Sequence, residues 1–236
     1  MRNSFLLKIG SLFIACFTTL NVAAQSSRTV SAKNFNNVAV SSGIDLFLTQ
    51  GNNENVVIKG QEEVIKDVVI EQEGNNLTIK YKEGINWGRL FKGTKIQVYV
   101  TVKKLNGISA SGGSDVETQN TINTDKMSIK SSGGADLDLN IICKDITISS
   151  SGGSDINLKG SAENMVLNTS GGSDVDAFEF KVNYAQVNTS GGSDANVYVN
   201  KGLTANATGG SDIHYKGNAA LKKVSNSKSA DITHVN

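Results

Sequence analysis

Apolar and polar residues alternate along most of this chain, and paired glycines interrupt the alternation at regular intervals. Counted from an aspartate that follows each glycine pair, the seventh residue before it and the first residue after it are always apolar. The third residue after it is apolar in most copies. A period of two is typical of β-strands that bury one face, and it does not fit a helix. The pattern therefore predicts one short strand on each side of every glycine pair.

The aspartates recur at a nearly constant spacing of 18 to 21 residues, at positions 115, 136, 155, 174, 194, 212 and 231. Six of the seven copies carry Gly-Gly three and two residues before the aspartate. The residue directly before it is always Ser or Ala. A period near 20 residues is typical of a solenoid, in which each repeat forms one rung and stacks on its neighbours.

The same residue type at the same phase of every copy favours a parallel coil over a series of hairpins. In a parallel coil, equivalent positions of successive rungs stack at the strand spacing, roughly 4.8 Å. The glycine pair supplies the corner of each rung, because glycine adopts positive φ without a steric penalty. The sequence thus predicts an all-β protein, a right-handed parallel β-solenoid with rungs of about 19–20 residues.

Three parts of the chain differ in pattern. Residues 1–24 have the basic start, the apolar run and the small-residue cleavage site of a signal peptide. Residues 25–104 form a β-rich section with a first, degenerate rung around Ser42-Gly43-Ile44-Asp45 and with longer strands, one of them over 64–72. A turn at Gly74 predicts a hairpin there, and we expect this section to cap the edge of the stack. Residues 105–236 carry the repeated rungs.

A signal peptide implies export, to the periplasm, the outer cell surface or the medium. The apolar run is too short to span a membrane, so we expect no transmembrane segment after cleavage. The residues before Cys16 weakly resemble a lipidation box, and lipid attachment at Cys16 stays open. Cleavage would remove Arg2 and Lys8, so the 23 basic residues would fall to 21 against 22 acidic ones. Such a balance offers no attraction to nucleic acid.

The loop over 84–93 is the most individual stretch of the chain, since it holds the only tryptophan. One interpretation is that Trp87 and Phe91 cover the edge of the core. The other is that Trp87, Arg89 and Phe91 form a platform for a sugar ring or a protein partner, because exposed aromatic residues beside arginine often anchor contacts.

The repeated Ser-Gly-Gly-Ser-Asp motif and the opening Val40-Ser41-Ser42-Gly43-Ile44-Asp45 resemble a bacterial family named "putative auto-transporter adhesin, head GIN domain". The resemblance covers about residues 35–235. It implies an exported β-helical protein with an adhesin role, and it supplies no catalytic residues.

The column of aspartates admits three interpretations. Stacked carboxylates repel by roughly 1 kcal/mol per neighbouring pair in water, so some interaction must offset the repulsion. As a scaffold, each carboxylate would accept hydrogen bonds from corner N–H groups. As a metal site, a ladder would hold Ca²⁺ through Asp115, Asp136, Asp155, Asp174, Asp194 and Asp212. As an enzyme, neighbouring aspartates would act as an acid–base pair, by analogy with pectin-degrading β-helices.

These patterns predict a non-catalytic, exported β-solenoid that acts as an adhesin or surface-binding protein. Its partner would be a surface ligand, either a glycan or a protein, and we expect no cofactor other than possible Ca²⁺. The alternative is a pectinase-like, carbohydrate-active enzyme. A uniform aspartate column would favour the scaffold, whereas a cleft that joins aspartates to one basic side chain would favour the enzyme.

Overall fold

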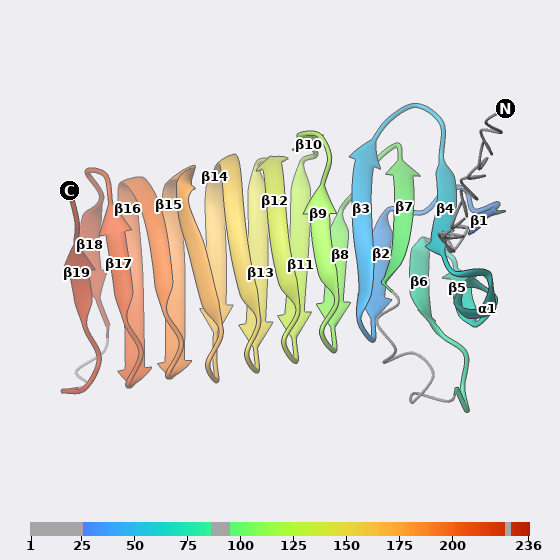
Figure 1. The fold of residues 1–236 in the computed structure, drawn as a ribbon. Coiled ribbons are helices and arrows are strands. Elements are labelled where there is room, and N and C mark those ends of the chain that lie inside the picture. The colour runs from blue at the N-terminus through green and yellow to red at the C-terminus, as the bar shows by residue number, and fades with distance from the viewer. Residues whose placement is uncertain (1–25, 86–94, 225–227) are drawn as a thin grey trace, which may run out of the picture.

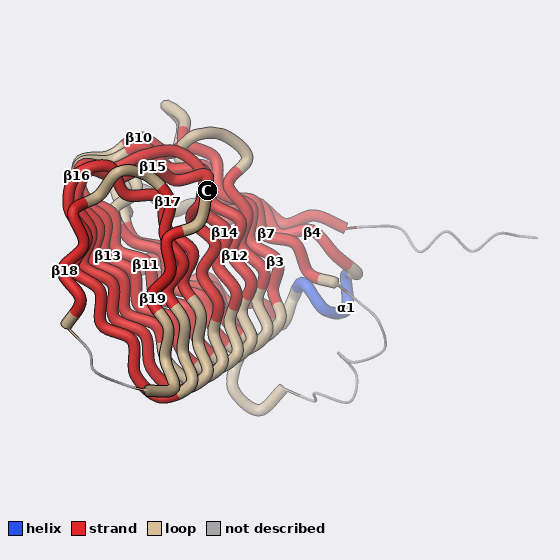
Figure 2. The backbone as a smooth tube through the Cα atoms, turned by 90° about the vertical axis from the view of Figure 1, so that its left-hand side faces the viewer, coloured by secondary structure: helices blue, strands red, loops and turns tan. Residues whose placement is uncertain are grey.

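The stacked rungs of a β-solenoid make up most of the protein in a computed structural model that describes residues 26–85, 95–224 and 228–236 (Figure 1). Each rung has one strand before the glycine corner and one strand after it. The strands before the corners form one wall, here called the pre-corner face, and those after the corners form the post-corner face. Viewed from the C-terminal end, the two walls enclose the core and the corners stack in a column (Figure 2).

The repeated rungs comprise twelve strands. The shorter ones are β8 (Gly107–Ser111), β9 (Asp115–Thr118), β10 (Ile122–Asn123), β11 (Lys126–Ser132), β12 (Asp136–Ile142), β13 (Asp145–Ser151), β17 (Ile213–Lys216), β18 (Ala220–Lys223) and β19 (Ile232–His234). The longer strands β14 (Asp155–Thr169), β15 (Asp174–Gly191) and β16 (Ala195–Gly209) each run from the post-corner face of one rung into the pre-corner face of the next.

Parallel, in-register pairing joins the rungs and confirms the predicted fold class. On the pre-corner face, Ile129 pairs with both Ile108 and Ile148, and the same column continues to Val187 and beyond. On the post-corner face, Leu137 pairs with Val116 and with Ile156. All of these side chains are at least 98% buried. The apolar positions that define the repeat therefore stack on themselves and form a continuous core.

The N-terminal section completes the stack in an order that differs from the chain order. Its elements are β1 (Ser26–Val30), β2 (Asn37–Ser41), β3 (Ile44–Gln50), β4 (Asn55–Gly60), α1 (Glu62–Ile65), β5 (Val68–Glu73), β6 (Asn76–Tyr81) and β7 (Ile96–Val102). The degenerate first rung, β2 and β3, pairs in parallel with β8 and β9 on one side and with β6 and β7 on the other. The first rung is therefore an internal layer.

Antiparallel strands close this end of the solenoid. Strand β4 pairs with β7, β1 pairs with β4, and β5 pairs with β6 through the predicted hairpin at Gly74. The expected strand over 64–72 was wrong at its start, because Val64 and Ile65 lie in α1 and the strand begins at Val68. Both side chains are buried. A helix turn can bury two adjacent residues, whereas a strand sends them to opposite faces.

The two glycines of each corner have different conformations. The first has positive φ in all six Gly-Gly corners, from 62° at Gly112 to 86° at Gly152. The second has positive φ in the first two of them, at Gly113 and Gly134, and lies outside the positive-φ region in the other four. Each corner also stacks closely on the one before it. A Cβ added to Gly152 would lie 2.8 Å from the Gly133 nitrogen, whereas one added to Gly153 would meet nothing within 4 Å.

These contacts predict unequal effects of alanine at two adjacent glycines. Gly152→Ala should lower the free energy of unfolding by at least about 1–2 kcal/mol, because alanine pays for the left-handed conformation and also contacts the neighbouring backbone. Gly153→Ala should change it by less than about 0.5 kcal/mol. Urea unfolding of both variants measures the difference. Equal losses of unfolding free energy would mean that the positive φ and the close contact of Gly152 do not require a glycine there.

Candidate functional site

The predicted aspartates stand at the start of the post-corner strands, one rung apart and in register. Asp136 pairs with both Asp115 and Asp155, and Asp155 pairs with Asp174. Their side chains face the solvent, as the alternation predicts, although Asp212 is partly buried. The structure thus brings all six predicted positions into one column along the solenoid axis.

Carboxylates of the C-terminal rungs accept hydrogen bonds from the next rung. The backbone N–H of Asp194 donates to Asp174 Oδ1 at 3.1 Å, that of Asp212 to Asp194 Oδ1 at 3.0 Å, and that of Asp231 to Asp212 Oδ1 at 2.9 Å. In the earlier rungs the N–H of Asp136 donates instead to the Ser114 carbonyl oxygen. A charged acceptor strengthens such a bond and offsets part of the repulsion between neighbouring carboxylates. These contacts agree with the scaffold interpretation.

The geometry for a metal ion is less complete. Within the described ranges, no group of three or more His, Cys, Asp or Glu side chains is arranged to hold a metal ion. A calcium ladder would therefore depend on backbone carbonyl groups and water for most of its ligands.

Buried hydroxyl groups line the inside of the corner, a feature that the sequence pattern did not reveal. Five copies of the repeat have a serine directly before the aspartate, and each of these serines is fully buried: Ser114, Ser154, Ser173, Ser193 and Ser211. Its hydroxyl donates to the backbone carbonyl three residues earlier, as Ser173 does to Ser170 at 2.9 Å. Contacts between rungs add to this, since Thr189 Oγ1 lies 2.9 Å from Ser211 Oγ. The corner is therefore held by hydrogen bonds on its inner side.

A long groove lies on the pre-corner face and has a volume of about 840 Å³. Two outward columns line it, located six and four residues before each aspartate. The first column contains Ser109, Lys130, Ser149, Asn168, Asn188 and Asn206, and the second contains Ser111, Ser132, Ser151, Ser170, Ser190 and Thr208. The groove extends toward the N-terminus over Ala39 and Ser41 of β2 and Thr78 of β6. It therefore crosses eight layers of strands.

Most of the residues that line this groove are Ser, Thr or Asn, which carry a hydroxyl or an amide group. Lys130 is the one charged side chain among the described residues that line it. Part of the lining is internally ordered, since Asn188 Nδ2 donates to Asn168 Oδ1 at 2.9 Å. The groove can therefore donate and accept hydrogen bonds along its length while carrying little charge. From the sequence, these positions are recognised only as polar. The short side chains that recur at them, Lys130 excepted, are the signal that could have revealed the groove.

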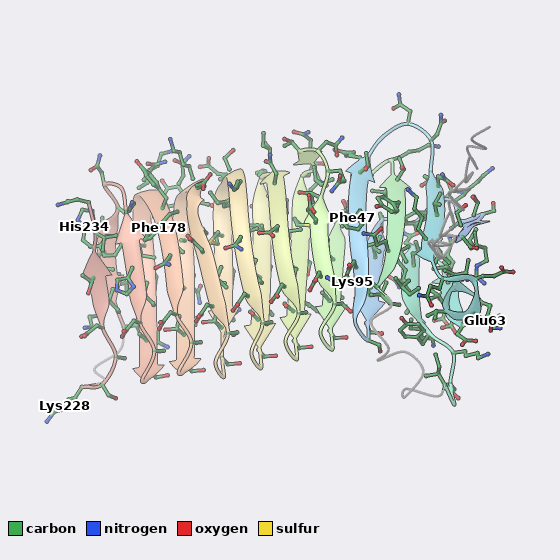
Figure 3. The ribbon with its side chains drawn as sticks, viewed as in Figure 1. Phe47, Glu63, Lys95, Phe178, Lys228 and His234 are labelled. Carbon is green, nitrogen blue, oxygen red and sulfur yellow. The ribbon has the colours of Figure 1, made fainter. Side chains whose placement is uncertain are left out.

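A second, smaller hollow of about 350 Å³ lies at the N-terminal end of the post-corner face. Asp45, which occupies the aspartate phase of the first rung, contributes to it together with Lys95, Asp115 and Asp136. The Asp45 side chain is only 13% exposed, and its Oδ2 lies 3.8 Å from Lys95 Nζ. Burial raises the pKa of the Asp45 carboxyl, Lys95 opposes this shift, and Asp115 adds to it. Lys95 is labelled in Figure 3.

The predicted platform of Trp87, Arg89 and Phe91 lies outside the described residues. A different aromatic pair is present near the smaller hollow. Phe47, which is labelled in Figure 3, also lines that hollow. It stacks on Tyr99 with ring centroids 4.8 Å apart, and Lys59 Nζ lies 4.3 Å from the Tyr99 centroid. The described part of the chain has no helix long and apolar enough to cross a membrane.

Comparison with known proteins links this chain to one family. The family described as "Putative auto-transporter adhesin, head GIN domain" matches residues 34–219, which is more than half of the chain. Comparison with curated proteins gives no match.

Solved structures share the fold at low sequence identity. A structure described as a putative adhesin from Bacteroides fragilis has a TM-score of 0.80 and 23% identity, covering 90% of this chain and 97% of that one. One from Parabacteroides distasonis, also described as a putative adhesin, has a TM-score of 0.73 and 22% identity, covering 91% and 98%. A putative lipid binding protein from the same species has a TM-score of 0.73 and 18% identity, covering 90% and 97%.

The hydrogen bonds of the aspartate column predict how Asp194 variants behave. Asp194→Asn should leave thermal stability unchanged or raise it, because the amide oxygen still accepts the Asp212 N–H and one repulsive charge is removed. Asp194→Ala should cost up to about 1 kcal/mol, because that N–H loses its acceptor within the protein.

Unfolding with calcium separates the scaffold from the ion ladder. We expect millimolar CaCl₂ to raise the melting temperature no more than NaCl of matched ionic strength does, in the wild type and in Asp194→Asn alike. A saturating rise specific to Ca²⁺ and lost in Asp194→Asn would contradict the scaffold interpretation.

Proposed function

The chain belongs to the auto-transporter adhesin, head GIN domain family, and we propose that it is an exported, non-catalytic solenoid that binds a surface ligand through the pre-corner groove. The observation that carries this proposal is the groove itself, which crosses eight layers and is lined by side chains that can form hydrogen bonds. Export rests on the predicted signal peptide over residues 1–24, and the family description supports a surface location.

Repetition suits this groove to ligands that are themselves long or repetitive. Each rung presents nearly the same pair of side chains, so a ligand can form the same weak contact several times. Weak contacts that act together along one ligand give tight binding overall, because after the first contact the others form at high effective concentration. The buried hydroxyl groups and the stacked corners keep the spacing between rungs fixed.

A rigid groove also costs little entropy on binding. The strands that carry the lining side chains pair with a neighbouring strand on each side, so these side chains extend from an ordered backbone. Pre-organised sites lose less conformational freedom when the ligand binds.

Two arginine variants test the location of binding. Ser149→Arg places a long charged side chain in the groove, whereas Asn157→Arg places the same side chain on the post-corner face of the same rung. We expect the purified protein to bind immobilised mucin, a glycoprotein, or immobilised fibronectin in biolayer interferometry. Ser149→Arg should weaken binding by about tenfold or more, and Asn157→Arg by less than about twofold.

Both substitutions replace solvent-facing side chains, so thermal unfolding should show similar stability for the two variants. Loss of binding in Asn157→Arg with normal binding in Ser149→Arg would place the ligand on the other face. Absence of binding to both surfaces would contradict the proposal as a whole.

The smaller hollow supports a second candidate function, a carbohydrate-active enzyme. It satisfies the condition set by the sequence, since it joins Asp45 and Asp115 to one basic side chain, Lys95. Burial raises the pKa of the Asp45 carboxyl, which gives Asp45 the character of a general acid. Asp115 in the next rung would then act as the general base of the pair. Asp45 is partly buried, as Asp212 is, and it lies 3.8 Å from the amino group of Lys95.

Activity measurements distinguish the two candidates. The enzyme candidate predicts that polygalacturonate yields new reducing ends or unsaturated products, that Asp45→Asn abolishes this activity, and that Asp174→Asn retains it. We expect neither product from the wild type, because the proposed function requires binding alone. Turnover that depends on Asp45 would replace the proposed function with the enzymatic one.

A further inference from the structure

We propose that the pre-corner groove binds a neutral, linear polysaccharide that lies along the solenoid axis, with about one sugar unit per rung. This inference rests on the proposed function and adds the chemical class and the orientation of the ligand. Four properties of the groove support it, namely its free hydroxyl groups, its low charge, its saturated backbone and its length.

Several hydroxyl groups in the groove are available to a ligand. Within the described part of the chain, no hydrogen bond involves the side-chain hydroxyls of Ser109, Ser111, Ser132, Ser149, Ser151 and Ser170. Each of these groups can donate one hydrogen bond and accept two. Ordered water can satisfy them, and the hydroxyl groups of a sugar can replace that water with equivalent hydrogen bonds. A ligand rich in hydroxyl groups therefore matches the groove best.

The charge of the two walls differs, and this difference selects among polymers. Among the described residues that line the groove, Lys130 is the one with a charged side chain. The post-corner face carries acidic side chains at most rungs, namely Asp115, Glu117, Asp136, Asp138, Asp155, Asp174, Asp176, Asp194 and Asp212. A polyanion finds one cation in the groove and is repelled by the acidic post-corner face, while a polycation is attracted to that opposite wall. A neutral polymer is the class that the groove favours.

Saturation of the backbone argues against an extended peptide. A peptide that adds to a sheet gains affinity through main-chain hydrogen bonds at a free strand edge. In the groove, strands β11 and β13 pair with neighbours on both sides, and so do the pre-corner segments of β14 and β15. The groove thus offers side chains alone. An acyl chain would also leave the hydroxyl and amide groups that it covers without hydrogen-bond partners, which a sugar would supply.

Length and spacing fix the orientation. Eight layers, separated by seven strand spacings, extend over about 34 Å. A sugar ring in an extended polysaccharide advances by nearly the same distance as one rung, so consecutive rings meet equivalent pairs of side chains, such as Ser149 and Ser151 followed by Asn168 and Ser170. A ligand across the axis would meet one or two rungs only, whereas a ligand along the axis uses the whole groove.

Affinity electrophoresis of the purified protein in gels that contain one polysaccharide each provides the test. The panel contains neutral chains (a β-glucan, a xylan, a galactomannan and dextran), an anionic chain (alginate) and a cationic chain (chitosan). We expect retardation by at least one neutral chain and by neither charged chain. Ser149→Arg and, in a second region of the groove, Ser190→Arg should abolish it, while Asn157→Arg retains it.

Oligosaccharides of the retarding polymer then test the orientation. Titration calorimetry should show affinity that rises with each added sugar and levels off at about eight units, the number of layers that the groove crosses. A plateau at two or three units would overturn binding along the axis. Retardation by the charged chains alone would overturn the neutral class.

Treatment of immobilised mucin from which sialidase has removed the acidic sugars separates this inference from the proposed function. Periodate oxidation of its sugars should abolish binding that is sensitive to Ser149→Arg. If such binding survives periodate but not protease, the ligand is a protein, so the inference fails and the proposed function stands. If no binding is sensitive to Ser149→Arg on any surface, both fail.

Discussion

Parallel stacking in register is the constraint on which the rest of this structure depends. Each position of a rung lies about 5 Å from its equivalent in the next rung, so every residue type must be acceptable beside a copy of itself. Apolar residues meet this condition directly, as in the column through Ile108, Ile129 and Ile148. Charged residues repel their copies, and in the C-terminal rungs backbone N–H groups offset this by donating to the carboxylates of Asp174, Asp194 and Asp212.

The corner combines three small residues, one glycine and two serines, for three physical reasons. The first glycine supplies positive φ and leaves room for the corner of the neighbouring rung. The buried serine after the glycine pair donates a hydrogen bond to the backbone carbonyl group three residues earlier. The serine before the glycine pair faces outward and lines the groove. One short motif therefore builds the turn, supports it from within and supplies half of the candidate binding surface.

The sequence predicts the features that repeat and misses those that arise between distant parts of the chain. The strands, the corners and the outward aspartates follow from a period of two and from glycine chemistry. The burial of Asp45 does not, because it depends on β7 and Lys95, which lie beside β3 only in the folded stack. The groove escaped prediction for another reason. It forms where side chains are small, and a polar Ser or Asn in one rung gives no sign of a hollow until all the rungs are aligned.

The internal position of the first rung separates the order of synthesis from the order of assembly. Strands β2 and β3 leave the ribosome early, yet both of their edges stay open until β6 to β9 have been made. The chain therefore cannot fold one rung at a time from its N-terminal end. The rungs after β9 are different, because each adds to a finished edge. Repeat number can accordingly change on the C-terminal side, and the groove lengthen or shorten with it, without rebuilding the cap.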